Sequence, residues 1–406
     1  MMKRICVALV DGYDDGHHLT HLRNYARILA ELDCDVLEFL PDPEPVRRWF
    51  EEHHPQVLER VRFFPYRFPK VVSPVWRWKA IIEPFQIWRH LARTLRAATA
   101  DTGLRPKLVF LNWLDSYIVG VSPLVAWLLP CIFPYRWSGV FFHPWHLRIP
   151  DGPTRHESVA AEAMLRSGGC VGTAVLDHWI VDALAVHTRG PVLAFPDETD
   201  TDLPPRDPGL VMQLREAAAG RRIILLPGVL AKRKGVMALL NTARLAEGRP
   251  WCFAFVGALD EGLRRTYSDA ELQLIDDAIA GKQSNVWFHP ARIENEKDFN
   301  AIVCASDVLF AAYALFAHSS GIVTKAGFFE KPVLVSPGYC MAQDVEAYRL
   351  GLVVDPHDPD AVLRGLGTVL DRAAWARQAG APDYAGFRQQ YGFDALKQSF
   401  REMLSL

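Results

Sequence analysis

Short apolar runs alternate with longer segments of helical spacing along almost the whole chain. The runs with strand character in the first half are Ile5–Val10, Asp35–Phe39, Leu108–Leu111, Gly139–Phe142, Gly169–Thr173 and Val192–Phe195. Those in the second half are Ile223–Leu226, Cys252–Val256, Val286–His289, Val308–Ala311, Val333–Ser336 and Gly351–Val354. Alternation of this kind is typical of βαβ units, so the sequence predicts an α/β fold with parallel sheets covered by helices on both faces.

The length of the chain and one change in composition predict two domains. A chain of 406 residues exceeds what one hydrophobic core usually organises. An acidic, proline-rich stretch over 200–208 has the composition of a linker. We therefore predict two Rossmann-like, doubly wound domains that face each other across a cleft, the first over 1–203 and the second over 204–382. The amphipathic tail over 383–406 is predicted to be a helix that packs back towards the first domain.

Composition narrows the class of protein. Half of the residues are hydrophobic, 23% are charged and the net charge is −2, so the chain is globular and has no overall attraction for nucleic acid. The seven cysteines are scattered and form no Cys-x-x-Cys pair. This pattern indicates free thiols in a reducing cytoplasm, with neither a zinc site nor a disulfide framework.

Two apolar segments bear on membranes. The first apolar run ends at Asp11, which is too early for a signal peptide. The uncharged segment from Tyr117 to Pro134 approaches the length of a membrane span, but Pro123 and Pro130 interrupt it and it lies between two strands of one sheet. We therefore predict a buried crossover helix there, and a cytoplasmic protein that is at most peripheral at the inner face of the membrane.

The most specific local pattern follows the strand at Ile223–Leu226. A glycine turn at Gly228 leads into the three cations at 232–234, and a helical pattern begins directly after Gly235. Free backbone N–H groups and the positive end of the helix dipole meet at such a junction, so it binds anions well. The sequence therefore predicts a site for a phosphate-bearing small molecule. The alternative is a solvated basic turn, which is common on protein surfaces.

The loop after the first strand is also rich in ionisable groups. Asp14, Asp15, His17 and His18 lie in this loop, where carboxylates and imidazoles are candidates for a general base. An ordinary strand-to-helix turn is the alternative, although such a turn does not need this many ionisable side chains.

These patterns together resemble the GT-B glycosyltransferases, in particular the large group-1 (family 4) class. The motifs that carry the resemblance are Gly228-Val229-Leu230 with Lys234-Gly235, Phe255-Val256-Gly257, Val286-Trp287-Phe288, Ala305-Ser306-Asp307-Val308, Glu330-Lys331-Pro332-Val333-Leu334 and the run Gly351–Asp358. The first half resembles the family more loosely, through its glycine loop, His143 and the linker.

The resemblance implies a nucleotide diphosphate sugar as donor, a hydroxyl acceptor (glycan, lipid-linked or small molecule) and no metal or other cofactor. It places His143 near the transferred sugar, with Trp145, His146 and Asp115 as candidates for the acceptor pocket. The residues implied at the donor diphosphate are Gly228, Arg233, Lys234, His318, Ser319, Ser320, Gly321 and Lys325. Arg292 and Glu294 fall in the loop that frames the base and ribose, although Glu294 also fits the start of a helix.

One departure from the family pattern is serious. The family carries two glutamates separated by seven residues, and this chain has Ala317 and Lys325 at those positions. The loss favours a rival hypothesis, in which the chain is a catalytically silent GT-B binding or scaffold protein. A second rival is a nucleotide-sugar epimerase of the same fold. The polar loop after the first strand and His143 favour an active transferase.

The sequence fits either stereochemical course of transfer. If configuration is retained, the leaving diphosphate accepts the proton of the acceptor hydroxyl. If configuration is inverted, a base on the opposite face is required, and the loop that contains Asp14 and His18 is the place to look for it.

The segment from Arg62 to Arg96 combines cations with aromatic residues and contains one carboxylate, Glu83. It fits a cover over the first sheet whose arginines reach past buried rings. It also fits a surface that meets anionic lipid headgroups. Stacking on single-stranded nucleic acid is the weakest alternative, and we predict no nucleic acid partner.

Overall fold

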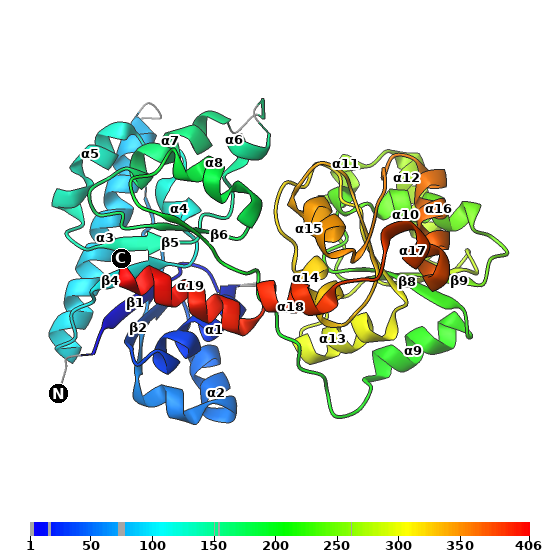
Figure 1. Cartoon of the computed structure of the whole chain (residues 1–406), viewed down its shortest axis with the longest axis horizontal. Helices are drawn as coiled ribbons and strands as arrows, with labels where there is room; N and C mark the ends of the chain where they lie inside the picture. The colour runs from blue at the N-terminus through cyan, green and yellow to red at the C-terminus, as the bar shows by residue number, and fades with distance from the viewer. Residues whose placement is uncertain (1–3, 15–17, 72–77, 150, 153–154, 261) are drawn as a thin grey trace. The chain divides into compact units, whose positions relative to one another are not determined.

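Every strand of the two large sheets pairs in parallel with its neighbours. The computed structural model of the chain describes residues 4–14, 18–71, 78–149, 151–152, 155–260 and 262–406. It divides into two units (Figure 1), the first formed by Met1–Pro196 with Gly392–Leu406 and the second by Asp197–Tyr391. Two doubly wound parallel-sheet units confirm the predicted fold class.

The first unit contains a five-stranded sheet in the order β3-β2-β1-β4-β5. Its strands are β1 Cys6–Val10, β2 Asp35–Leu40, β3 Val61–Pro65, β4 Leu108–Leu111 and β5 Trp137–Gly139. A parallel pair, β6 Thr173–Val175 and β7 Val192–Ala194, continues from β5 through bridges at Trp137 and Val140.

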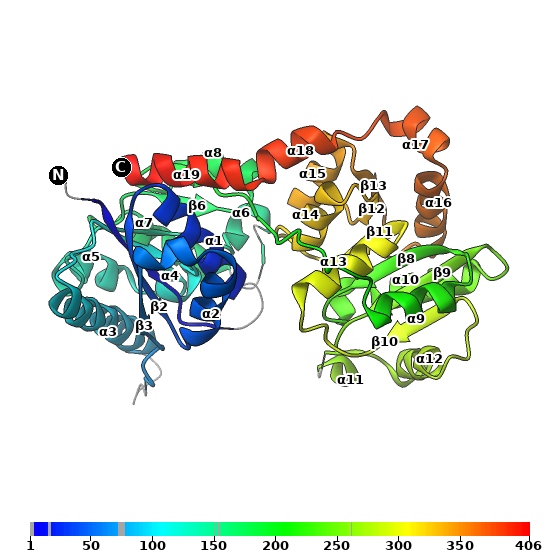
Figure 2. The ribbon, with the colours of Figure 1, turned by 90° about the horizontal axis from the view of Figure 1, so that it is seen from below.

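Helices cover both faces of this sheet (Figures 1 and 2). They are α1 His18–Glu31, α2 Glu44–His53, α3 Lys79–Thr102, α4 Asp115–Ile118, α5 Pro123–Ile132, α6 Trp145–Arg148, α7 Arg155–Leu165, α8 Val181–Ala185 and α19 Phe393–Ser405, with 3-10 turns at Pro55–Glu59 and His178–Ile180. Alternate residues of β1 point to opposite cores, as the strand period requires. Ala8 and Val10 pack with α3, α5 and α7, whereas Val7 and Leu9 pack with α1, α2 and α19.

The second unit contains a six-stranded parallel sheet in the order β10-β9-β8-β11-β12-β13. The strands are β8 Arg222–Pro227, β9 Trp251–Val256, β10 Val286–His289, β11 Val308–Ala311, β12 Val333–Val335 and β13 Gly351–Val353. The helices are α9 Gly209–Ala218, α10 Val236–Leu245, α11 Leu263–Thr266, α12 Asp269–Ile279, α13 Glu296–Ala305, α14 Gly321–Phe328, α15 Cys340–Tyr348, α16 Pro359–Leu370, α17 Arg372–Ala379 and α18 Tyr384–Tyr391, with a 3-10 turn at Lys232–Lys234.

Each sheet reverses its direction of winding once. In the first unit the reversal lies between β1 and β4, and in the second it lies between β8 and β11. Ligands of open parallel sheets bind outside the carboxyl ends of the strands at such a switch point. The fold therefore marks one candidate site in each unit.

Three differences from the sequence predictions have physical reasons. Strand β3 was not predicted, because it is an edge strand with a mixed, half-exposed pattern that ends in proline. The expected crossover helix over Tyr117–Pro134 is broken into α4 and α5 by Gly120, which has a φ of 69°, and by Pro123. Part of α5 is exposed, so this crossover is not fully buried. No helix in the described part of the chain has the length and apolar character of a membrane span.

The linker and the tail divide at positions that the composition alone does not indicate. Residues 197–203 already belong to the second unit, whereas the sequence predicted a boundary at 203/204. The predicted tail helix is two helices, of which α18 belongs to the second unit and α19 to the first. Phe400 of α19 packs 5.1 Å from the ring of Phe110 and 4.9 Å from that of Phe195.

Glu38 is the most unusual core residue of the first unit. It lies in the middle of β2 with none of its surface exposed, and neither carboxylate oxygen has a hydrogen-bond partner in the described residues. Burial raises the pKa of this carboxyl well above its usual value. The folded protein therefore keeps a proton on Glu38 at a pH where the unfolded chain has released it. The free energy of unfolding is therefore highest below the pKa that Glu38 has in the unfolded chain. It falls as the pH rises from there towards the higher pKa that Glu38 has in the folded protein.

We expect Glu38→Met, which keeps the side-chain length and removes the acid, to raise the free energy of unfolding of the first unit. The gain should grow from about pH 5 to about pH 8 with a slope of up to about 1.4 kcal/mol per pH unit. Urea denaturation followed at both pH values measures it, with exposed Glu52→Met on α2 as the control. A gain that does not change with pH would contradict the assignment of a protonated Glu38.

Candidate functional site

The carboxyl ends of β1, β4 and β5 bring a set of polar and aromatic side chains together in the first unit. Asp11 follows β1 directly, Asn112 and Trp113 follow β4, and His143 follows β5 at a short distance. Backbone hydrogen bonds fix these segments, because Asp11 N donates to Phe39 O and Asn112 N donates to Val10 O, both at 2.9 Å. The set therefore lies at the switch point between β1 and β4.

Asp11 orients His18. The carboxylate is buried, and its Oδ2 lies 2.8 Å from His18 Nδ1 and accepts a hydrogen bond from the amide of Asn112. Its Oδ1 accepts from the backbone N–H of Tyr13 at 3.0 Å. Because an ionised carboxylate only accepts hydrogen bonds, the arrangement assigns the ring proton of neutral His18 to Nδ1 and leaves Nε2 as the basic nitrogen.

Asp115 plays the same part for His143. Its Oδ1 lies 2.8 Å from His143 Nδ1 and accepts from the backbone N–H of His143 at 2.9 Å. Its Oδ2 accepts from the backbone N–H of Phe142 at 2.8 Å. The sequence placed Asp115 in the acceptor pocket, whereas the structure makes it the residue that fixes the ring of His143 and the loop after β5.

The two histidines flank one indole ring. The centroid of half-buried Trp113 lies 4.7 Å from that of His18 and 5.3 Å from that of His143. Phe142 stacks on the same indole at 4.0 Å. The arrangement thus joins two Asp–His pairs across an aromatic surface, which suits a ligand with both hydroxyl groups and an apolar face.

The other sequence candidates of the first unit have different surroundings. Asp14 is exposed, and Asp15 and His17 lie outside the described residues. Trp145 stacks on His143 at 5.8 Å, with 16° between the ring planes. His146 does not line an acceptor pocket, because its buried Nε2 lies 3.0 Å from Glu162 Oε1.

Glu162 is shared among several basic side chains, which explains why His146 turns inward. His187 Nδ1 and Arg166 Nη2 lie 3.0 and 2.9 Å from its Oε2. This internal cluster fixes α6 against α7, so the expectation that His146 contacts the acceptor is corrected.

In the second unit the predicted basic turn adopts the expected shape. Gly228 has a φ of 93° and Gly235 a φ of 78°, both in the left-handed region that favours glycine, and α10 begins directly afterwards. Lys234 Nζ lies 3.9 Å from the position that a Cβ would occupy at Gly228. It also lies 3.4 Å from the hydroxyl of Tyr313 and 4.5 Å from the centre of that ring. The ammonium group is therefore held over the glycine turn.

The turn meets the loop that follows β11. Ala314 N donates to Arg233 O at 2.8 Å, and the Arg233 guanidinium lies 5.1 Å from the ring of Phe316. Phe316 in turn contacts the ring of His318 at 5.4 Å. The structure thus brings the two predicted diphosphate segments, the basic turn and the loop over 316–321, to one switch point.

Helix α14 begins at the end of this loop. Ser319 and Ser320 are half-buried, and Ser320 is the N-cap, although its side chain makes no capping hydrogen bond. The backbone N–H groups of Gly321 and Ile322 belong to the first turn, where helices leave amides without intrahelical partners. This helix end therefore adds to the positive potential around Lys234.

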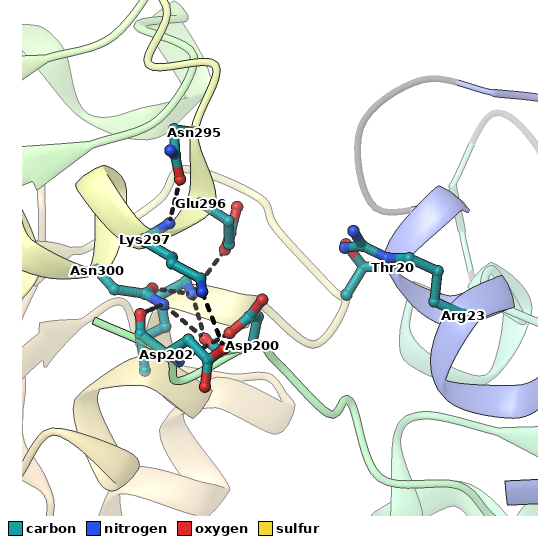
Figure 3. Close-up of polar contacts among 9 residues, drawn as sticks. Thr20, Arg23, Asp200, Asp202, Asn295, Glu296, Lys297 and Asn300 are labelled. Carbon is teal, nitrogen blue, oxygen red and sulfur yellow. Dashed lines mark hydrogen bonds and ion pairs between the residues drawn. The ribbon is translucent and has the colours of Figure 1, made fainter. Parts of the chain in front are cut away.

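Lys325 does not join these groups, although the sequence placed it at the donor diphosphate. Its side chain is 2% exposed, and its Nζ lies 2.7 Å from Glu296 Oε1 and 3.0 Å from the carbonyl oxygen of Asp200. It also donates to Asn300 Oδ1. Figure 3 shows Glu296 and Asn300 of α13 turned towards Asp200 of the linker. Lys325 sits one turn into α14, on the side of the helix that faces α13.

The predicted nucleoside residues are both exposed. Arg292 Nε lies 3.6 Å from Glu294 Oε2 on the segment between β10 and α13. The N-cap of α13 is Asn295, whose side chain accepts from the backbone N–H of Lys297 at 2.9 Å. Asn295 therefore caps α13, and Glu294 lies one residue before the cap.

Sequence reasoning missed three residues of these sites: Asp11, Trp113 and Tyr313. One sequence signal would have identified all three residues. Each lies directly or nearly directly after an apolar strand, and the strands concerned flank the two switch points.

No protein-family model and no curated protein matches the chain, whereas solved structures match over nearly its whole length. Sucrose-phosphate synthase from Thermosynechococcus elongatus is 16% identical with a TM-score of 0.66, and the match covers 99% of this chain and 100% of that one. HepE of Anabaena in complex with UDP and glucose is 16% identical with a TM-score of 0.64, over 99% and 100% of the two chains. WaaG, a glycosyltransferase involved in lipopolysaccharide biosynthesis, is 14% identical with a TM-score of 0.60, over 98% and 99%. The fold of this chain is therefore the GT-B fold of these glycosyltransferases, as its sequence predicted.

Proposed function

We propose that this protein transfers a sugar from a nucleoside diphosphate sugar to a hydroxyl group of an acceptor, without a metal ion. The observation that carries the proposal is the ammonium of Lys234, which lies over the Gly228 turn and beside the loop that begins α14. Structures of the same fold support it, since HepE is described in complex with UDP-glucose and the matched E. coli trehalose-6-phosphate protein with UDP-2-fluoro glucose.

The donor side follows from the charge that develops during transfer. The bond between the anomeric carbon and the diphosphate oxygen breaks, and negative charge grows on the leaving diphosphate. Lys234, Arg233 and the first-turn amides of α14 stabilise that charge, and they are held in place before the reaction begins. Fixed cations of this kind take the part that a metal ion plays in other transferases.

The acceptor side follows from the two Asp–His pairs. In this proposal His143, oriented by Asp115, contacts the transferred sugar. His18, oriented by Asp11, lies across Trp113 and contacts the acceptor, whose oxygen forms the new bond to the anomeric carbon. The acceptor proton leaves through His18 Nε2 or through an oxygen of the departing diphosphate, according to the face on which the acceptor attacks.

The catalytically silent alternative rests on a specific observation. Buried Ala317 and Lys325 occupy the positions at which the group-1 class carries glutamates. The ammonium of Lys325 forms an ion pair with Glu296 and hydrogen bonds with Asn300 Oδ1 and the carbonyl oxygen of Asp200. A panel of nucleotide sugars, tested with and without candidate hydroxyl acceptors, separates the hypotheses. Nucleotide binding without turnover of any donor would favour the silent protein, and sugar isomerisation without an acceptor would favour the epimerase.

We expect Lys234→Met to weaken UDP binding by roughly tenfold to a hundredfold, because a charge-assisted contact to the diphosphate is lost. Isothermal titration calorimetry with UDP measures the change. Lys232→Met is the matched control on the same turn, since Lys232 Nζ donates to Thr266 O at 2.6 Å and faces the ring of Tyr267. Equal affinities of the two variants would contradict the placement of the diphosphate.

We expect His143→Ala to lower kcat by about 10²- to 10⁴-fold while UDP affinity stays unchanged, because the imidazole acts at the sugar and not at the diphosphate. Asp115→Asn should lower kcat in the same direction, since the amide does not fix the same ring tautomer. Steady-state kinetics on the donor identified by the panel gives both values. Exposed His156→Ala on α7 is the control, and an undiminished kcat in His143→Ala would exclude the proposed role.

A further inference from the structure

Helix α5 has an apolar outer face that stays partly exposed in the described part of its unit. Its sequence, Pro-Leu-Val-Ala-Trp-Leu-Leu-Pro-Cys-Ile, contains no charged residue. Val125, Ala126 and Leu129 point into the core of the first unit. On the opposite side Trp127 is 76% exposed and Leu124 is 48% exposed. Leu124, Trp127, Leu128 and Cys131 have the spacing of one helix face, and we name them the α5 face.

Two neighbouring elements extend this face. Ser122 N donates to Ala80 O at 3.0 Å, which places the start of α5 beside the start of α3, where Trp78 is 55% exposed. Gly120 N donates to Glu157 O at 3.4 Å, which places α7 beside the same segment, and Val159 of α7 is 42% exposed. Figures 1 and 2 both show α5 at the rim of the first unit with α3 and α7 next to it.

The exposed side of α3 carries positive charge. Arg89, Arg93 and Arg96 are exposed and lie at the spacing of one helix face. Exposed Lys79 begins the helix beside Trp78. The opposite side of α3, which includes Trp88 and Leu95, is buried in the core. The helix that carries this basic stripe packs directly against α5.

We propose that the α5 face docks this protein on a membrane surface that contains anionic lipids. A helix of ten residues is too short to span a bilayer, so it would lie in the interface with Trp127 and Leu124 inserted among the headgroups. Tryptophan favours this boundary, and the arginines of α3 favour anionic headgroups. One apolar signal combined with one basic signal is the usual requirement for stable peripheral binding.

Charge is also the reason for choosing a membrane over a second copy of the chain. A two-fold contact through the α5 face would bring the basic stripes of both copies to the same interface. Like charges at an interface oppose association, whereas an anionic surface attracts the same stripe. The segment that the sequence singled out, Arg62–Arg96, contributes its cations and exposed Trp78, whereas its rings Tyr66 and Trp88 are buried and do not contact lipid.

The proposal is independent of the proposed transferase activity, and the experiment keeps the two apart. The full-length protein is sedimented with vesicles of phosphatidylcholine alone and with vesicles that also contain phosphatidylglycerol. We expect binding to the anionic vesicles that weakens as salt is added, and little binding to the neutral ones. The double variant Leu124→Ser/Trp127→Ser should lose roughly tenfold or more in affinity, since both inserted side chains are removed.

The controls separate lipid contact from misfolding and from general stickiness. Met212→Ser removes an apolar side chain of similar exposure (64%) from α9 in the second unit and should leave vesicle binding unchanged. UDP binding by the double variant shows that the second unit is folded, and circular dichroism tests the first. Arg89→Gln/Arg93→Gln should reduce binding to the anionic vesicles alone.

Cys131 provides a direct reporter of insertion. All seven cysteines lie in the described residues, and Cys131 is the one that is exposed. An environment-sensitive fluorophore on Cys131 should shift to the blue with anionic vesicles and stay unchanged without them. Wild-type protein that does not sediment with anionic vesicles, or a double variant that binds like the wild type, would overturn the proposal. A dimer that the double variant abolishes would also overturn it, because the occupant would then be a second copy.

Discussion

The reversal of winding in each parallel sheet is the constraint on which both sites depend. Between β1 and β4, and between β8 and β11, the connections leave on opposite faces, so the carboxyl ends of the two central strands are not crossed by a helix. Backbone amides and short polar side chains gather there because they have no apolar layer to enter. Asp11 reaches Asn112 across one reversal, and Lys234 reaches Tyr313 across the other.

The second of the two positions at which the group-1 class carries glutamate has a structural role of its own in this chain. Lys325 lies at this position, and its ammonium donates to the carbonyl oxygen of Asp200, to which Asn300 Nδ2 also donates at 3.0 Å. Asn300 extends the attachment to the carbonyl oxygen of Asp202 at 2.8 Å. The buried ammonium has three oxygen partners, of which Glu296 carries the compensating charge, so removal of Glu296 would leave a buried cation without an ion-pair partner. The first turn of α14 therefore follows the loop that contacts Arg233, while its second turn anchors the linker to this unit.

Much of the fold could be predicted from the sequence, because strand periodicity and strand length are local properties. Strands β1, β4, β8 and β9 lie where their apolar runs indicated, and the glycine turn at Gly228 has the predicted geometry. The directions of individual side chains could not be predicted in this way. They depend on partners far along the chain: Glu162 draws His146 inward, and Asp115 determines the orientation of His143. The position of a residue near a strand end therefore indicates where a site lies. Which residues pair with one another inside the site depends on tertiary contacts that the local sequence does not contain.

Helix α5 illustrates the same limit for burial. Its sequence is apolar on every side, and such a helix is normally buried, so a covered crossover was the reasonable prediction. Contacts with α3 and α7 leave only Val125, Ala126 and Leu129 of this helix fully buried. Leu124 and Trp127 could be polar at no cost to the core, since they do not pack in it. Their apolar character is therefore not required by the core of this unit, and docking on a membrane surface, as proposed above, gives a reason for it.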